Sequence, residues 1–287
     1  MKPWDLISVK KLYQSAWVFV LTLLISSTLS AQVWQQPPRS QENLDALDRV
    51  EIKSYRFEEA GGIKMEYGLY VPRSYDANAD TPLVIALHGL GSGILYMMEY
   101  NNLLEYAESY GFIIATPMGY NERGWYGARG MGNDFSRIPA NAPDSAHNPA
   151  NLGELSELDV LNVLTEVKDQ FNIDEDRIYL IGQSMGGGGT WYIGAKYSNI
   201  WAALAPMAPA APGDNSILEN ATQLPVMVVM GDADELVDVN VTRQWVQKMK
   251  ELEINFEYIE VPGGSHASAG RENIGKVFEF LSRHKKE

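Results

Sequence analysis

The sequence predicts an α/β fold in which a mostly parallel central sheet carries helices on both faces. Short apolar runs with the length of buried strands alternate with longer segments whose apolar residues recur at helical spacing. Strands that alternate with helices pair in parallel, because each helix crosses back over the sheet. The alternation begins near residue 51, so we expect a single domain over residues 51–287, which is long enough to bury a full hydrophobic core.

The individual elements follow from their local patterns. An opening hairpin is expected to turn at Gly61 and Gly62, and continuous apolar runs predict strands buried on both faces. Helices are expected where apolar residues recur three and four positions apart. The expected strands are 52–57, 63–71, 82–88, 112–117, 178–181, 201–208, 225–230 and 256–261, and the expected helices are 97–110, 156–171, 241–252 and 271–284.

Two segments precede this domain. Residues 1–31 combine early lysines, an apolar run at 17–25 and small residues up to Ala31, which is typical of a secretory signal peptide. The apolar run is short for a bilayer span, so a retained anchor is the less favoured alternative. Residues 32–50 are polar and contain two prolines, and they predict a linker. We expect a secreted or periplasmic protein with no stable membrane anchor after cleavage.

Residues 177–190 carry the most informative motif. The apolar strand 178–181 runs into Gly182-Gln183-Ser184-Met185-Gly186, and a helix-like segment follows. Gly-x-Ser-x-Gly between a strand and a helix is typical of a nucleophile elbow, in which a strained serine presents its hydroxyl above the sheet edge. Glycine is needed at 182 and 186 because a side chain would collide there. The alternative, a phosphate-binding glycine turn, is disfavoured because no P-loop lysine follows.

A serine nucleophile needs a histidine base, and the chain has 4 histidines. His88 ends a buried strand, His147 lies before the elbow and His284 lies in the basic tail. His266 follows the last expected strand, which fits the chain order serine, acid, histidine of this type of site. We therefore predict His266 as the base, with an exposed loop histidine as the alternative.

The acid is expected between the serine and the histidine, at the end of a strand. Asp232, Asp234 and Asp238 follow the strand at 225–230. Asp232 directly follows the strand-ending glycine, which favours a turn-shaping role. We predict that Asp234 orients the base and stabilises its imidazolium form. In the alternative, all three are turn or surface carboxylates.

Two backbone N–H groups are expected to hold the oxyanion. One belongs to Met185, the residue after the nucleophile. The other is assigned to Leu90 in the glycine-rich loop 88–93, where glycines let the backbone approach a substrate oxygen. A glycine turn that caps the next helix is the alternative for this loop.

The long irregular stretch at 119–153 follows an expected strand and should lie at the carboxyl edge of the sheet, where ligands bind in such folds. We expect it to be a flap that faces the substrate, with Trp125 and Tyr126 as candidate substrate-binding aromatics. A surface loop without this role is the alternative.

The composition excludes several kinds of chemistry. The chain has 0 cysteines, which excludes thiolate catalysis, thiolate zinc sites and disulfides. Its net charge of −14 disfavours nucleic acid and anionic membranes as partners. No cofactor motif or metal cluster stands out, so we expect neither a cofactor nor a metal. The sequence leaves the oligomeric state open.

These features resemble the α/β-hydrolase superfamily. More narrowly, segments 67–72, 82–89, 174–187 and 201–206 are similar to secreted esterases grouped with polyhydroxybutyrate depolymerases and feruloyl or acetylxylan esterases. The resemblance implies a serine esterase that works through an acyl-enzyme with Ser184, Asp234 and His266. It also implies small-molecule or oligomeric ester substrates, such as polyester oligomers or aryl and hydroxycinnamoyl esters.

The chain departs from this group in lacking cysteine, since many secreted relatives carry disulfides, and it shows no separate substrate-binding module. Two alternatives remain open. One is a serine peptidase of the same fold, and the other is a non-catalytic binding protein on a hydrolase scaffold.

Overall fold

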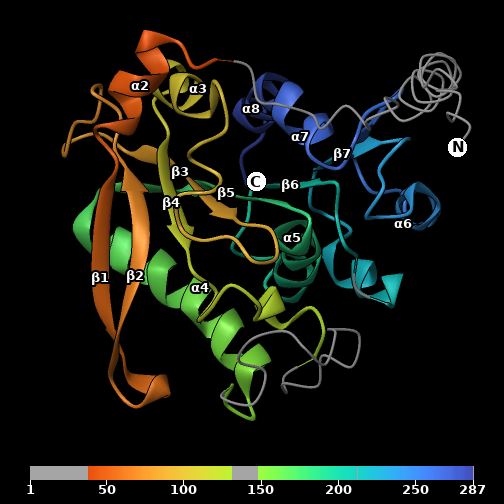
Figure 1. Ribbon diagram of the computed structural model, residues 1–287, viewed down its shortest axis with the longest axis horizontal. Coiled ribbons are helices and arrows are strands. Elements are labelled where there is room, and N and C mark those ends of the chain that lie inside the picture. Colours follow the sequence, from red (N-terminus) through yellow and green to blue (C-terminus); the bar gives the residue numbers. More distant parts are fainter. Residues whose placement is uncertain (1–37, 131–147, 212, 287) are drawn as a thin grey trace, which may run out of the picture. The chain divides into compact units, whose positions relative to one another are not determined.

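The computed structural model describes residues 38–130, 148–211 and 213–286. These lie in a compact unit that spans Pro37–Glu287 and is built on one eight-stranded sheet (Figure 1). The strand order is β1-β2-β4-β3-β5-β6-β7-β8. β1, β2 and β4 pair antiparallel, whereas the pairs from β4 through β3 to β8 are parallel. The predicted α/β fold with a mostly parallel sheet is confirmed.

The strands lie close to the ranges that their apolar runs predict. Every residue of β3 is buried, as expected for a central strand that is covered on both faces. β5 begins earlier than expected and is the longest strand. The strands are β1 Glu51–Phe57, β2 Ile63–Tyr70, β3 Thr81–Leu87, β4 Ile113–Pro117, β5 Ile173–Gln183, β6 Ala203–Met207, β7 Val226–Gly231 and β8 Phe256–Val261.

Helices cover both faces of the sheet, and each face has its own core cluster. Leu83 and Ile85 of β3 belong to a cluster with residues of α4, α5 and α6, whereas Val84 and Ala86 belong to a cluster with residues of α3 and α8. The described helices are α2 Gln41–Leu47, α3 Leu103–Tyr110, α4 Leu152–Gln170, α5 Met185–Lys196, α6 Val239–Glu251, α7 Ser268–Glu272 and α8 Ile274–Ser282, with short 3₁₀ segments η2 Glu58–Ala60, η3 Trp125–Gly127 and η5 Asn215–Ala221.

α4 begins four residues before the expected 156, and two other helices depart from their expected ranges for local backbone reasons. The helix expected at 97–110 begins only at Leu103, because Asn102 before it has a left-handed φ of 70°. The C-terminal helix expected at 271–284 is divided into α7 and α8 at Asn273, whose φ of −109° and ψ of 10° interrupt the helical backbone.

The linker expected at 32–50 needs a correction in its second half, because residues 41–47 form α2. Ser40 caps this helix by accepting a hydrogen bond from the Asn43 N–H at 3.0 Å. Asn43 and Ala46 are buried, and an ion pair of 2.9 Å joins the following Arg49 to Glu108 of α3. The polar residues that suggested a linker instead form a helix, which is stabilised by hydrogen bonds and by the ion pair that follows it.

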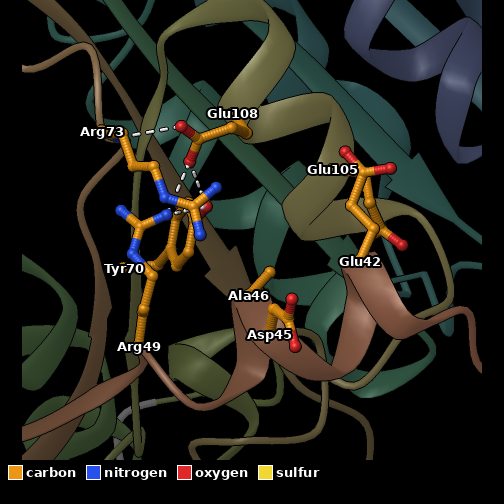
Figure 2. Close-up of a pocket in the computed structure, with 8 residues that line it drawn as sticks. All are labelled: Glu42, Asp45, Ala46, Arg49, Tyr70, Arg73, Glu105 and Glu108. Carbon is orange, nitrogen blue, oxygen red and sulfur yellow. Dashed lines mark hydrogen bonds and ion pairs between the residues drawn. The ribbon is translucent and has the colours of Figure 1, made fainter.

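A charged cavity of 330 Å³ lies where α2, β2 and α3 meet. Figure 2 shows Arg49 and Tyr70 converging on the Glu108 carboxylate, to which the Tyr70 hydroxyl donates at 2.5 Å. Tyr70 pairs with Ile114 near the start of β4, so this cavity lies at the amino edge of the parallel strands. The lining residues are Glu42, Asp45, Ala46, Arg49, Tyr70, Arg73, Glu105 and Glu108.

Residues 1–37 lie outside the described residues, so the signal peptide and residues 32–37 of the linker stay predictions. Within the described part of the chain, no helix combines the length and the apolar character needed to cross a bilayer.

Candidate active site

Ser184 lies between β5 and α5 in the strained backbone conformation expected of an elbow. Its φ of 59° and ψ of −117° are unusual for any residue other than glycine. The Ser184 N–H donates to Met207 O at 3.0 Å, and the Ser184 carbonyl accepts from the N–H groups of Gly188 at 3.0 Å and Ala210 at 2.9 Å. These hydrogen bonds from the elbow helix and the loop after β6 hold the strained residue in place.

The predicted need for glycine at 182 and 186 is confirmed by the space around them. A Cβ atom at Gly182 would lie 2.3 Å from the Gly186 carbonyl oxygen, and one at Gly186 would lie 2.2 Å from the Leu87 carbonyl oxygen. Both neighbours are backbone atoms that cannot move aside cheaply. The close approach of α5 to β5 and β3 therefore depends on these two glycines.

His266 and Asp234 are brought together by the loops that follow β8 and β7. His266 Nδ1 lies 2.8 Å from Asp234 Oδ2, and the Asp234 side chain has no exposed surface. Asp234 Oδ1 accepts from the N–H groups of Leu236 at 2.9 Å and Val237 at 2.8 Å. Because the carboxylate accepts, Nδ1 carries the proton in the neutral imidazole, and this leaves Nε2 as the basic nitrogen.

The other two aspartates of this loop have separate hydrogen-bonding roles. Asp232 Oδ1 accepts from the Gly263 N–H at 2.6 Å and so ties the loop after β7 to the loop after β8. Asp238 caps α6 by accepting from the Asn240 N–H at 2.9 Å. Asp234 is therefore the member of the three whose carboxylate faces His266.

The remaining histidines have other contacts. His88 is buried, with Nδ1 2.8 Å from the Gly89 carbonyl oxygen and Nε2 2.9 Å from the Met118 carbonyl oxygen, and burial lowers the pKa of His88. His284 Nδ1 lies 2.8 Å from the Phe280 carbonyl oxygen. His147 lies outside the described residues.

The amides predicted for the oxyanion hole, those of Leu90 and Met185, follow β3 and β5 at the carboxyl edge. Neither amide donates to an acceptor among the residues that the structure describes. Met185 is the first residue of α5, where the N–H groups of a helix lack intrahelical partners and the helix dipole favours negative charge. Both N–H groups thus have no acceptor within the described part of the chain.

Tyr126 does not fit its expected role as a substrate-facing aromatic. Its side chain is fully buried, and its hydroxyl accepts a hydrogen bond from the His88 N–H at 3.1 Å. Burial leaves no ring face for a substrate, so the structure corrects this expectation to a structural contact beneath the loop after β3. Trp125 is partly buried, with the Arg129 guanidinium 4.3 Å above its ring. Residues 131–147 of the expected flap lie outside the described residues.

Sequence reasoning missed a buried carboxylate that holds the start of this loop. Asp159 of α4 has no exposed surface and accepts from the Gly119 N–H at 2.6 Å and the Tyr55 hydroxyl at 2.5 Å. Burial raises the pKa of Asp159 to about 6. The available signal was a charged residue between Leu158 and Val160 on the apolar side of the expected helix.

The candidate site thus consists of a strained serine, a histidine–aspartate pair and two free amides at the carboxyl ends of parallel strands. Gln183, next to the serine, donates to the His266 carbonyl at 3.1 Å and so joins the elbow to the histidine loop. Among the described residues, no group of three or more histidines and acids could hold a metal ion. This set of groups suits acyl transfer by a nucleophilic serine.

Comparison with known proteins places the chain among ester hydrolases. Residues 78–284 match the PET hydrolase-like (PETase) family. Cutinase 1 of Thermobifida cellulosilytica is 24% identical over 200 residues, which cover 67% of this chain and 72% of the cutinase. The bifunctional acetylxylan esterase/xylanase of Neocallimastix patriciarum is 26% identical over 189 residues, which cover 65% of this chain but only 24% of that much longer protein.

Solved structures agree on the fold. A thermostable esterase superposes with a TM-score of 0.65 at 23% identity, covering 84% of this chain and 64% of the esterase. The CE1 ferulic acid esterase of Anaeromyces mucronatus superposes with a TM-score of 0.61 at 19% identity, covering 82% of this chain and 90% of the esterase. The chain therefore has an α/β-hydrolase fold and belongs to the PET hydrolase-like family.

Proposed function

We propose that Ser184, His266 and Asp234 form the catalytic triad and cleave esters through an acyl-enzyme. The observation that carries this proposal is the 2.8 Å hydrogen bond between His266 and the fully buried side chain of Asp234, at the same sheet edge as the strained Ser184. A serine in a strained turn and a histidine in a fixed tautomer are the two requirements of this chemistry.

In the proposed mechanism, His266 Nε2 accepts the Ser184 hydroxyl proton as Oγ attacks the ester carbonyl carbon. The N–H groups of Met185 and Leu90 stabilise the oxyanion, each contributing about 3 kcal/mol to the transition state. Collapse of the intermediate breaks the bond to the alcohol oxygen, which takes the proton from His266. Water then attacks the acyl-enzyme with His266 again as the base, and this step releases the acid and restores Ser184.

For the substrate, we propose esters with an apolar acyl group, namely polyester oligomers or aryl and hydroxycinnamoyl esters. Two exposed leucines belong to the loops of the proposed site. Leu90, whose backbone N–H is a proposed oxyanion donor, is 43% exposed, and Leu236, two residues after Asp234, is 72% exposed. Exposed apolar side chains beside a catalytic site favour apolar ligands. The name of the PET hydrolase-like family supports polyesters, and the name of the ferulic acid esterase neighbour supports hydroxycinnamoyl esters.

We also propose that the enzyme acts outside the cytoplasm after loss of residues 1–31, because of the charge and hydropathy pattern of this segment. N-terminal sequencing of the protein recovered from culture medium or periplasm should begin at or near Gln32. An intact Met1 in those fractions would contradict this proposal.

The test is hydrolysis of a substrate panel by the wild type and by Ser184→Ala. The panel holds p-nitrophenyl esters of increasing acyl length, methyl ferulate, a hydroxybutyrate oligomer and a peptide anilide. We expect ester hydrolysis in the wild type and a loss of about 10⁶-fold in kcat in the variant, as for other serine hydrolases. Cleavage of the anilide alone would favour a peptidase, and near-normal ester hydrolysis by Ser184→Ala would refute the proposed nucleophile.

A further inference from the structure

Gln183 is a polar residue in a position where the fold favours an apolar one. It ends the central strand β5, directly before the proposed nucleophile, and it is only 2% exposed. Residues 178–181 before it are all buried and apolar or aromatic. A buried amide is unfavourable unless both its oxygen and its nitrogen are hydrogen-bonded, so its hydrogen-bond partners should explain why glutamine occupies this position.

Both ends of the Gln183 amide are used, and each contacts a different loop of the site. Nε2 donates to the His266 carbonyl oxygen at 3.1 Å, and Oε1 accepts from the Tyr96 hydroxyl at 3.1 Å. A carbonyl oxygen can only accept, so Nε2 must face His266 and the orientation of the amide is fixed. One side chain thus bridges the loop after β3 to the loop after β8.

The same side chain also lies against the proposed oxyanion loop. A Cβ atom on Gly89 would lie 3.0 Å from Gln183 Oε1, so the amide fills the space beneath this loop. Tyr96 in turn packs against α7, where the Arg271 guanidinium lies 5.2 Å from its ring centre. α7 begins two residues after His266, so the tyrosine is held by the same segment that Gln183 positions.

The His266 backbone is held on both sides. Its carbonyl accepts from Gln183, and its N–H donates to Glu235 Oε2 at 3.3 Å. Asp234 fixes the orientation of the imidazole ring through Nδ1, but the position of the ring also depends on the position of the His266 backbone. The Gln183 contact is the one that links this backbone directly to the strand that bears the nucleophile.

We propose that Gln183, held by Tyr96, is a positioning residue that sets the distance of His266 from Ser184. This inference rests on the proposed triad. The amide does not touch the reacting atoms, so its loss should slow proton transfer and leave ester binding unchanged. A displacement of about 1 Å in a catalytic group can lower the rate by about 100-fold.

The test compares Gln183→Leu and Tyr96→Phe with matched controls far from the site. Asn43→Leu also removes a buried amide, which donates to Glu105 at 2.9 Å, and Tyr179→Phe also removes a hydroxyl that donates to a carbonyl, that of His284 at 2.8 Å. For a p-nitrophenyl ester, we expect Gln183→Leu to lower kcat by about 10- to 100-fold with KM unchanged. Both controls should keep the wild-type kcat at a temperature well below their Tm.

Tyr96→Phe distinguishes positioning from a general loss of stability. It should lower kcat by a smaller factor in the wild-type background and have no further effect in the Gln183→Leu background, because the hydroxyl acts through the amide. Tyr96→Phe also keeps the proposal testable if Gln183→Leu does not fold.

Three results would overturn the inference: a Gln183→Leu kcat equal to that of Asn43→Leu, a rise in KM alone, or a full Tyr96→Phe effect that persists in the Gln183→Leu background. Failure of the triad gives a different result, since Ser184→Ala would then retain ester hydrolysis whatever Gln183→Leu does.

Discussion

The buried carboxyl of Asp159 should make stability depend on pH in a direction opposite to that of most acids. This group is fully buried, and its pKa is raised from 3.8 to about 6. A raised pKa means that the folded state favours the protonated form, so its contribution to stability is present below pH 3.8 and is lost as the pH rises through 6. At about 1.4 kcal/mol for each pH unit, the loss amounts to about 3 kcal/mol.

The measurement compares the free energies of unfolding of the wild type and Asp159→Asn in urea between pH 3.5 and 7, followed by tryptophan fluorescence. Other acids cancel in the difference between the two proteins, so wild type minus variant should fall by about 3 kcal/mol over this range. As a control, the pKa of Asp214 is lowered by hydrogen bonds from Ser216. The same difference for Asp214→Asn should therefore rise with pH, and by less.

A difference that stays flat or rises with pH for Asp159→Asn would refute this reasoning. It would mean that the donors around the carboxyl, the Tyr55 hydroxyl at 2.5 Å and the Gly119 N–H at 2.6 Å, stabilise the ionised form at least as much as burial disfavours it. The loop after β4 would then be held by a permanent buried charge.

The remaining predictions concern the elbow, the acid and the loop after β3. Gly186→Ala places a methyl group 2.2 Å from the Leu87 carbonyl oxygen and should lower the free energy of unfolding by more than about 2 kcal/mol, measured in urea; an unchanged midpoint would contradict the close packing. Asp234→Asn should keep the fold but lower kcat by about 10⁴-fold, whereas Asp232→Asn should change kcat by less than about tenfold; equal losses in the steady-state rates would contradict the assigned acid. Tyr126→Phe removes the acceptor of the His88 N–H and should lower stability by about 1 kcal/mol with a fall in kcat rather than a rise in KM; an unchanged kcat would mean that this hydroxyl does not hold the loop.

Most of the fold could be predicted because its signals are local. The strand at 82–88 is a continuous apolar run that a sheet covered on both faces requires, and all of β3 is buried. The elbow could also be predicted from the sequence. Its two glycines are required, because the short distances around Gly182 and Gly186 exclude any side chain. The chain order of serine, acid and histidine led to Asp234 and His266, which are hydrogen-bonded in the structure.

Other features could not be predicted because they depend on partners distant in sequence. α2 has a polar composition, and it is joined to α3 by the hydrogen bond from Asn43 to Glu105 and, through the following Arg49, by the ion pair with Glu108. Tyr126 suggested an aromatic platform, yet its burial and its hydrogen bond to His88 follow from the path of a loop that no periodicity predicts. Gln183 gave only the signal of a polar residue at the end of an apolar strand, and its two partners lie 87 and 83 residues away.

The most direct test of the central claim is to locate the covalent adduct formed with a fluorophosphonate, a probe that phosphonylates an activated serine. Wild-type protein is treated with the probe and digested, and the modified peptide is sequenced by mass spectrometry, with Ser184→Ala treated in parallel. A single adduct on Ser184 and none in the variant is the predicted result. An adduct on another residue, or an unmodified wild type that still hydrolyses esters, would contradict Ser184 as the nucleophile.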